Sequence, residues 1–163
     1  MIKIKRLAYR DLKHVIGDPA TSKGRKKIVN ELVTVKLPFT FYNWSKKKKK
    51  FIPVNYIRCH KSIGESVADA LQEILNHYGI EIIKKLGLNR ECGGSYNHRK
   101  TRDGNWWSVH AWGAAVDLWC HMGGYGKKPT IPNEIIQIFK KRRFYWGGDF
   151  KNPDGMHFSR VFG

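Results

Sequence analysis

The sequence lacks a long apolar run and contains few cysteines, and each shortage excludes a class of protein. No stretch of about 18 apolar residues occurs among the 163 residues, so no membrane-spanning helix is expected. The three cysteines, Cys59, Cys92 and Cys120, are odd in number and form no Cys-x-x-Cys pair. A disulfide framework and a thiolate zinc finger are therefore disfavoured, and we expect buried free thiols. Because 41% of the residues are apolar and 13% are aromatic, a wholly disordered chain is excluded.

Acidic residues are also scarce, and the resulting positive charge is unevenly distributed. The chain has 31 Lys and Arg residues against 13 Asp and Glu residues, a net charge of +18. Residues 1–50 carry +12 of that charge, and the rest of the chain carries +6. Such a field attracts polyanions, among them nucleic acid, anionic lipid surfaces and the phosphate-rich polymers of bacterial envelopes. The simpler alternative is that the charge only keeps the protein soluble.

The amino-terminal third predicts a basic arm followed by two strands. Residues 1–30 are polar and basic, so we expect a loosely held N-terminal arm. Residues 31–44 are β-branched and aromatic, which is typical of a strand, although Pro38 interrupts the pattern. The like-charge run Lys46 to Lys50 must be solvated and predicts a loop, after which residues 51–57 resume as a short strand.

A helix is indicated most clearly in the middle of the chain. Ser62 and Glu65 have the spacing of a capping box at a helix start. Apolar residues repeat at helical spacing over 67–78, and Gly79 supplies a stop. Residues 80–88 are compatible with either a second short helix or a strand.

The carboxyl-terminal half mixes strands, loops and one further helix. We expect a loop over 90–107, a buried strand over 114–119, a helix over 133–143 and a last strand over 155–161. Helices and strands do not alternate strictly, which favours an α+β fold around a small antiparallel sheet. The length suits one compact domain, which we place at residues 31–163.

Two of the seven histidines have neighbours that suit metal binding. His110 lies seven residues before Asp117, a carboxylate inside an apolar strand, where burial is costly unless the group is paired or bound to a metal. His157 lies three residues after Asp154. If His157 is a third ligand, two His and one Asp leave a fourth zinc position for water, with Asp154 near it as a general base. The alternative from spacing alone is that these histidines are ordinary core side chains.

Charged and aromatic residues surround this candidate site. Arg99 and Arg102 lie in a Gly-rich loop upstream, and their permanent charge suits them to stabilise a developing oxyanion. The aromatic residues Trp106-Trp107 and Trp112 are candidates for lining a substrate groove. For Trp119, packing in the core is at least an equal alternative.

The combined pattern resembles a known family of peptidases. Residues 108–117 read Ser-x-His-x-x-Gly-x-Ala-x-Asp, followed by Trp-Gly-Gly at 146–148 and Asp-x-x-His-Phe at 154–158. This order resembles the zinc D-Ala-D-Ala carboxypeptidases and phage L-alanyl-D-glutamate endopeptidases, the VanY-like group that shares its fold with the hedgehog signalling domain. Residues 94–99, Gly-Ser-Tyr-Asn-His-Arg, are similar to the phage branch of this group. The resemblance covers residues 31–163.

The resemblance implies a role for each matching residue. The implied fold is a small antiparallel sheet flanked by helices, with Zn²⁺ in a surface groove. The implied zinc ligands are His110, Asp117 and His157. Asp154 is implied as the catalytic base and Arg99 as the transition-state clamp, with Arg102 as its competitor because the loop alignment is ambiguous. Ser108 is expected to hydrogen-bond the substrate or to orient the site.

The resemblance also implies a substrate and a cellular setting. The substrate is the peptide stem of bacterial peptidoglycan, cut at either L-Ala-D-Glu or D-Ala-D-Ala. From their charge, we expect the basic arm and the lysine run to hold the protein on anionic wall polymers or outer-membrane lipid. The equal alternative is that they are a solvated and partly disordered tail. The charged start leads into no apolar signal-peptide core, which fits a phage lysis enzyme made in the host cytoplasm and released by a holin. A virion component has the same features. We expect a monomer with no dedicated nucleic-acid partner.

Two other functions compete with the peptidase. A basic nuclease of the His-Asn-His type fits the charge and could use Asn97, His98 and His110, but it leaves Asp117 and the Asp-x-x-His-Phe segment unexplained. A non-catalytic zinc module that binds peptidoglycan or a protein partner is the second alternative. Such a module needs no general base, so the presence of Asp154 argues against it.

Overall fold

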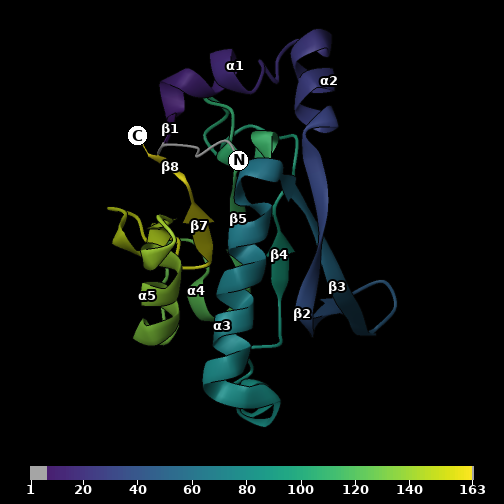
Figure 1. Ribbon diagram of the computed structural model, residues 1–163, viewed down its shortest axis with the longest axis vertical. Helices are drawn as coiled ribbons and strands as arrows, with labels where there is room; N and C mark the ends of the chain where they lie inside the picture. Colours follow the sequence, from purple (N-terminus) through teal and green to yellow (C-terminus); the bar gives the residue numbers. More distant parts are fainter. Residues whose placement is uncertain (1–6, 163) are drawn as a thin grey trace.

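The computed structural model describes residues 7–162 and places small antiparallel sheets among helices, as Figure 1 shows. The central sheet has four strands in the order β4-β5-β7-β6, and every neighbouring pair is antiparallel. Its strands are β4 (Cys92–Gly94), β5 (Ala115–Leu118), β7 (His157–Ser159) and β6 (Tyr145–Trp146). The α+β class with a small antiparallel sheet is confirmed. The short strand β4 lies within the expected loop over 90–107.

The longest helix, α3 (Lys61–Lys85), begins at a different cap from the one predicted. The side chain of His60 accepts the backbone N–H of Ser62 at 3.2 Å, so the cap is His60, and Ser62 already lies in the first turn. The other ring nitrogen of His60 pairs with Glu31 Oε2 at 2.9 Å. The capping-box prediction is therefore wrong, because a buried imidazole occupies the capping position. Gly79, at φ 70° and ψ 159°, breaks the helix as expected, and the segment after it is helical again.

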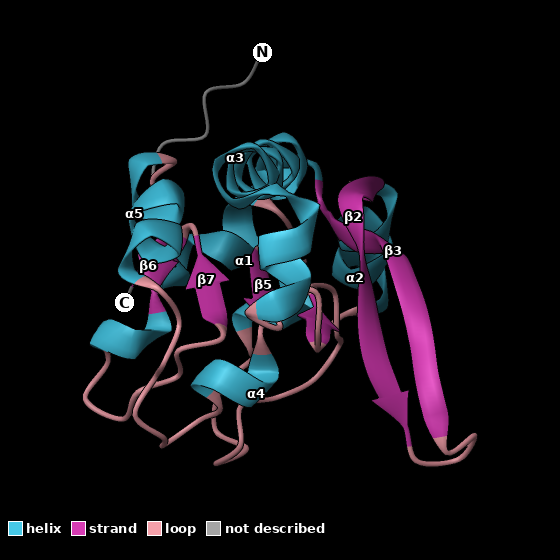
Figure 2. Cartoon of the chain, turned by 90° about the horizontal axis from the view of Figure 1, so that it is seen from below, coloured by secondary structure: helices cyan, strands magenta, loops and turns pink. Residues whose placement is uncertain are grey.

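A long antiparallel hairpin flanks α3 on one side (Figure 2). Its strands are β2 (Leu32–Ser45) and β3 (Lys50–His60), and the turn between them holds the lysine run, as predicted. The register shifts between Lys36 and Phe41. Pro38 lies within this irregular stretch, where a residue without a backbone N–H costs no regular ladder hydrogen bond.

Residues 7–30 fold against the rest of the chain, so the prediction of a loosely held arm is wrong for this stretch. They form β1 (Leu7–Ala8), a 3₁₀ turn η1 (Tyr9–Asp11), α1 (Leu12–Val15) and α2 (Ser22–Asn30). β1 pairs in parallel with β8 (Val161–Phe162). The buried side chains of Leu12, Ile16 and Ile28 pack with Trp112 in a second core. Residues 1–6 of the expected arm lie outside the described residues.

The main core lies between α3, the inner face of the sheets and α5 (Asn133–Lys141). The predicted helix over 133–143 is confirmed, and a short helix α4 (Cys120–Gly123) lies within the preceding segment. The predicted last strand is divided into β7 and β8, because Arg160 separates them. No helix among residues 7–162 is both long and apolar enough to cross a membrane.

The cysteines are free, and two of them are buried, as expected. Cys59 and Cys92 lie in the main core, whereas Cys120 is only partly covered. Burial raises the pKa of the Cys59 thiol to about 12 and that of Cys92 to about 11. These thiols stay protonated near neutral pH and are therefore poor nucleophiles and poor metal ligands.

Candidate metal centre

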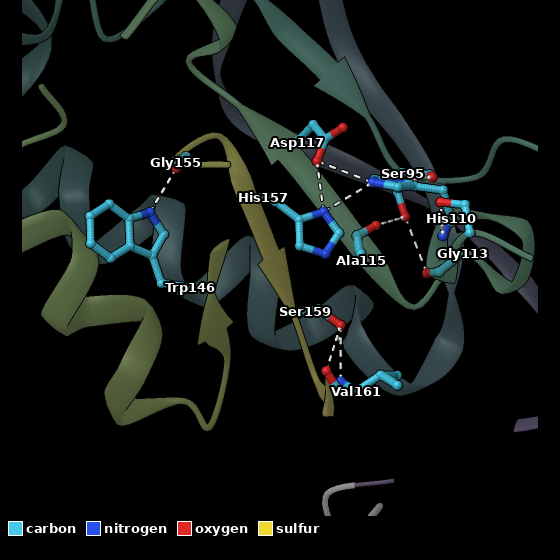
Figure 3. Close-up of polar contacts among 11 residues, drawn as sticks. Ser95, His110, Gly113, Ala115, Asp117, Trp146, Gly155, His157, Ser159 and Val161 are labelled. Atoms are coloured by element: carbon cyan, nitrogen blue, oxygen red, sulfur yellow. Dashed lines mark hydrogen bonds and ion pairs between the residues drawn. The ribbon is translucent and has the colours of Figure 1, made fainter. Parts of the chain in front are cut away.

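The fold brings His110, Asp117 and His157 into a tight triangle (Figure 3). The His110 Nε2 atom lies 3.1 Å from Asp117 Oδ1 and 3.2 Å from His157 Nδ1, and the third side of the triangle is 3.1 Å. Asp117 and His157 face each other directly across the β5–β7 pair. His110 comes from the neighbouring 3₁₀ turn η2 (Val109–Trp112). Residues 40 positions apart in the sequence thus meet because two strands pair in register.

Local backbone geometry holds His110 toward the two strands. Ser108 caps the turn by accepting the backbone N–H of His110 at 3.3 Å, which supports its expected role in orienting the site. Gly113 ends the turn at φ 64°, a conformation that other residues rarely adopt. A side-chain Cβ at this position would also come within 2.9 Å of the His60 backbone nitrogen. The glycine therefore allows the chain to pass directly from His110 into β5.

A second layer of hydrogen bonds sets the tautomer of His110. Its Nδ1 atom lies 2.7 Å from the backbone carbonyl of Ser95, and a carbonyl can only accept, so Nδ1 carries the proton. The Nε2 atom then presents its lone pair to the triangle. Ser95 is itself anchored, because its buried hydroxyl lies within hydrogen-bond distance of the carbonyls of Gly113 and Ala115. This is the arrangement by which metal-binding histidines are usually oriented.

The donor set and its spacing fit a zinc ion. Three atoms that bind one zinc at about 2.0–2.2 Å in a tetrahedron lie roughly 3.3–3.6 Å apart, only slightly more than the distances seen here. The carboxylate of Asp117 and the Nε2 lone pair of His110 both point inward, and two acceptors at 3.1 Å repel each other unless a cation or proton lies between them. His110, Asp117 and His157 would hold the metal as three protein ligands and leave a fourth position open.

Asp117 is held in its charged form. Burial alone would raise the pKa of this carboxyl group. When a proton rather than a metal lies between the three groups, hydrogen bonds and charge interactions with the protonated imidazoles of His110 and His157 outweigh burial and hold the pKa well below its usual range. A carboxylate that remains ionised is the form that binds a cation.

The predicted base, Asp154, lies beside the triangle in a tight turn. Its backbone N–H donates to the Gly147 carbonyl at 2.8 Å, and its own carbonyl accepts the His157 N–H at 2.9 Å. The Trp146 indole donates to the Gly155 carbonyl at 2.7 Å, as Figure 3 shows. A Cβ at Gly147 would collide with the carbonyl oxygen of Asp154. The Trp-Gly-Gly segment therefore positions Asp154 next to His157.

The carboxyl group of Asp154 is poised to accept a proton. Its Oδ1 atom is buried and has no hydrogen-bond partner among the described residues. Burial raises its pKa, and the negative charge of Asp117 acts in the same direction, while His157 and Arg102 oppose the shift. A buried acceptor with an open lone pair and an elevated pKa suits a general base.

His110, His157 and Asp154 open into one groove with a volume of about 870 Å³, whereas Asp117 is not among the residues that line it. The predicted site residues that line it are His110, His157, Asp154, Ser108, Arg99 and Arg102. Aromatic residues form much of the remaining wall, and sequence reasoning missed Tyr9, Tyr125 and Phe150 among them. Tyr9 donates its hydroxyl to the Trp107 carbonyl at 2.5 Å and packs edge-on against Trp106. No local pattern marks Tyr9, since it lies in a basic stretch about 100 residues from the motif.

Both candidate arginines lie in the groove wall and are exposed. A guanidinium N–H of Arg99 donates to the carbonyl of Lys100 at 3.3 Å. The Arg102 guanidinium lies 4.2 Å from the centre of the Tyr125 ring. Its positive charge acts to lower the pKa of Asp154. The structure thus brings both residues to the site.

Trp112 does not line the groove, so its assignment to substrate binding is not supported by the structure. Its side chain is fully buried in the second core, and its indole N–H donates to the Gly17 carbonyl at 2.7 Å. Trp119 is likewise buried, in the main core, where its indole donates to the Leu88 carbonyl. Trp106 and Trp107 do line the groove. The N-terminal helices cover Trp112, which the sequence could not show.

We expect Trp112→Ala to act on stability. Removing a fully buried tryptophan and its hydrogen bond should lower the free energy of unfolding by about 3–5 kcal/mol. Trp106→Ala is the matched control, because that side chain is 64% exposed and its loss should change stability by about 0.5 kcal/mol or less. Urea titration followed by far-ultraviolet circular dichroism measures both. Equal losses from the two substitutions would contradict the buried position of Trp112.

A comparison with family models finds a peptidase family over the same segment. The model described as D-alanyl-D-alanine carboxypeptidase matches residues 101–160, which include the triangle and Asp154. A search of curated proteins and a search of solved structures each gave no match. The family match supports a peptidase, and the geometry of the triangle places a candidate metal site within the matched stretch.

Proposed function

We propose that the protein is a zinc-dependent peptidase that hydrolyses an amide bond in the peptide stem of bacterial peptidoglycan. The observation that carries this proposal is the His110–Asp117–His157 triangle, with sides of 3.1–3.2 Å, inside the segment that matches a D-alanyl-D-alanine carboxypeptidase family. The adjoining groove is large enough for several residues of a peptide. Its two arginines suit the carboxylate groups that such a stem carries.

The triangle and Asp154 have different roles in hydrolysis: the triangle binds the metal, and Asp154 transfers the proton. Zinc bound by the triangle would lower the pKa of a water molecule and polarise the scissile carbonyl. Asp154 accepts the proton of the attacking water on its unpaired Oδ1 atom and then returns it to the leaving amine. The turn that joins Asp154 to His157 keeps the base next to the metal-binding atoms.

The arginines stabilise negative charge on the substrate, and we assign the clamp on the developing oxyanion to Arg99. Arg99→Gln should lower kcat by about 10²–10³-fold, the usual cost of removing such a donor. Arg102→Gln is the matched control in the same loop and should cost less than about tenfold. Steady-state kinetics on a soluble stem peptide measures both. A larger loss from Arg102→Gln would transfer the role to Arg102.

Synthetic stem peptides test the proposed activity and identify the bond. The probe is a pentapeptide with the order L-Ala, D-Glu, a diamino acid, D-Ala and D-Ala, incubated with the zinc-loaded protein. Release of free D-Ala identifies a carboxypeptidase, and release of L-Ala identifies an L-alanyl-D-glutamate endopeptidase. If the folded, zinc-loaded protein releases neither product, and also fails on intact peptidoglycan, the proposed function is wrong.

The proposed setting is lysis of a bacterial host by a phage or prophage. The similarity of residues 94–99 to the phage branch of the family supports this part of the proposal. The enzyme would be made in the host cytoplasm and reach the wall through a holin. A role as a virion component remains the alternative.

The rival functions find less support in the geometry. A His-Asn-His nuclease would need His98 beside His110, but His98 Nε2 lies 2.9 Å from the Pro19 carbonyl and its ring packs on Trp107. A non-catalytic zinc module has no use for the buried, unpaired oxygen of Asp154.

A further inference from the structure

The far end of the β2–β3 hairpin projects away from the helices and the central sheet, as Figure 2 shows. Its turn carries Lys46 to Lys49, Lys50 begins β3, and all five side chains are exposed. Over residues 32–60 the chain contains seven Lys and Arg residues and no Asp or Glu. None of the five lysines forms an ion pair with another described residue. The hairpin end therefore carries an uncompensated positive charge.

Large apolar side chains stand directly beside these lysines. Trp44 and Phe51 face each other across the two strands, with ring centres 5.2 Å apart in an edge-to-face contact. They are 52% and 50% exposed. Tyr42 lies two residues before Trp44, so it is on the same face of the hairpin, and it is 41% exposed. Half-exposed aromatics clustered on one face usually mark a binding surface.

A cationic side chain also flanks the aromatic face where it joins the body of the protein. The Arg90 guanidinium lies 6.0 Å from the centre of the Phe51 ring. A shallow hollow of about 230 Å³ lies between Tyr42, Phe51 and Arg90. The aromatic strip thus has positive charge at both ends, from the lysine run on one side and Arg90 on the other. We call this surface, formed by Tyr42, Trp44, Lys46–Lys50, Phe51 and Arg90, the hairpin tip.

We propose that the hairpin tip binds the surface of an anionic lipid bilayer. Lysines next to a membrane are attracted to acidic headgroups, and Trp and Tyr rings prefer the interface between headgroups and acyl chains. The tip combines both properties at the end of a hairpin that projects away from the central sheet, as Figure 2 shows. A polyanion without apolar or aromatic groups would use the lysines but has no need of the Trp44–Phe51 pair. This inference concerns attachment, and it is independent of the proposed peptidase activity.

The tip is a better candidate for this attachment than the described part of the basic N-terminal segment. In that segment Lys13 pairs with Asp18 at 3.6 Å, and the ammonium of Lys27 donates to the Val15 carbonyl at 2.9 Å. The α2 helix does expose Lys23, Arg25 and Lys26, but its buried apolar residue, Ile28, packs into the second core. Charge without an exposed aromatic face supplies only one of the two attractions.

Co-sedimentation of the full chain with lipid vesicles tests the proposal. The protein should bind phosphatidylglycerol vesicles at least about tenfold more tightly than phosphatidylcholine vesicles. Each lysine near an anionic surface contributes about fivefold, so the triple substitution K46Q/K47Q/K48Q should weaken binding by about a hundredfold. The control K23Q/R25Q/K26Q removes the same charge from α2 and should weaken binding by less than about threefold.

A second pair of variants tests the aromatic contribution. W44T/F51T should weaken binding to phosphatidylglycerol vesicles by about tenfold or more, whereas Y56T, at an exposed position nearer the base of the hairpin, should have little effect. Circular dichroism confirms that each variant is folded. Full binding by W44T/F51T together with loss in K46Q/K47Q/K48Q would show attraction to polyanions only and overturn the proposal. Equal losses from the two charge variants, or no binding by the parent protein, would overturn it as well.

Discussion

Asp154→Asn is expected to lower kcat on peptidoglycan stem peptides by about 10²–10⁴-fold, the contribution of a positioned general base. The amide has nearly the shape of the carboxyl group, so the turn to His157 should persist. The substituted side chain can no longer take the proton that Oδ1 accepts in the parent protein. Zinc content should stay at one ion per chain, because Asp154 lies outside the ligand triangle. Parallel measurements of kcat and bound zinc therefore separate the base from the ligands.

Asp149→Asn is the control for this experiment. Asp149 lies five residues away at an exposed position and pairs with Lys140 at 2.7 Å. Exposed ion pairs contribute little to stability, so this substitution should leave both kcat and zinc content within about twofold of the parent protein. Turnover by Asp154→Asn within tenfold of the parent would remove Asp154 from the role of base.

His157→Ala should abolish zinc binding and, with it, all measurable hydrolysis. The substitution removes one of three ligands and opens one side of the triangle. The loss of zinc affinity should exceed the roughly 10–100-fold typical for loss of an outer hydrogen-bond partner. Mass spectrometry of the metal content after dialysis measures the effect directly, and circular dichroism shows whether the fold persists.

His77→Ala serves as the matched histidine control. His77 lies on α3, is exposed and has no place in the triangle. It should retain both the metal and the activity. If His157→Ala kept a full complement of zinc, the ligand set derived from the triangle would be wrong.

The residues that meet at the candidate metal centre were named from the sequence through the family resemblance, because spacing alone left open that the histidines were core side chains. His110 and Asp117 belong to one local turn and strand, and Asp154 and His157 belong to one tight turn. Short segments of this kind fix the relative positions of their side chains through local backbone geometry. The sequence predicted a small antiparallel sheet, but no local pattern showed that β5 pairs with β7, which is the contact that brings the two segments together.

The surroundings of the site depended on contacts that no local pattern reveals. Trp112 is an aromatic residue close to the motif, which made it a candidate for the groove, but α1 and α2 cover it. Tyr9, from the same N-terminal segment, forms part of the groove wall. That segment is strongly basic, and its few apolar residues form no pattern that predicts a folded segment. Nevertheless Leu12 and Ile28 are buried and pack it onto the rest of the domain. The cap at His60 was missed for a similar reason, since a buried imidazole paired with Glu31 replaces the usual small polar residue.

Digestion of purified peptidoglycan, with and without a chelator, is the decisive experiment for a metal-dependent peptidase. The new chain ends are identified by mass spectrometry. We expect new amino and carboxyl termini within the peptide stem, their disappearance when a chelator removes the metal, and their return when zinc is added. Intact stems after incubation with a folded, zinc-loaded protein would contradict this expectation, as would cleavage that continues at full rate after the metal has been removed.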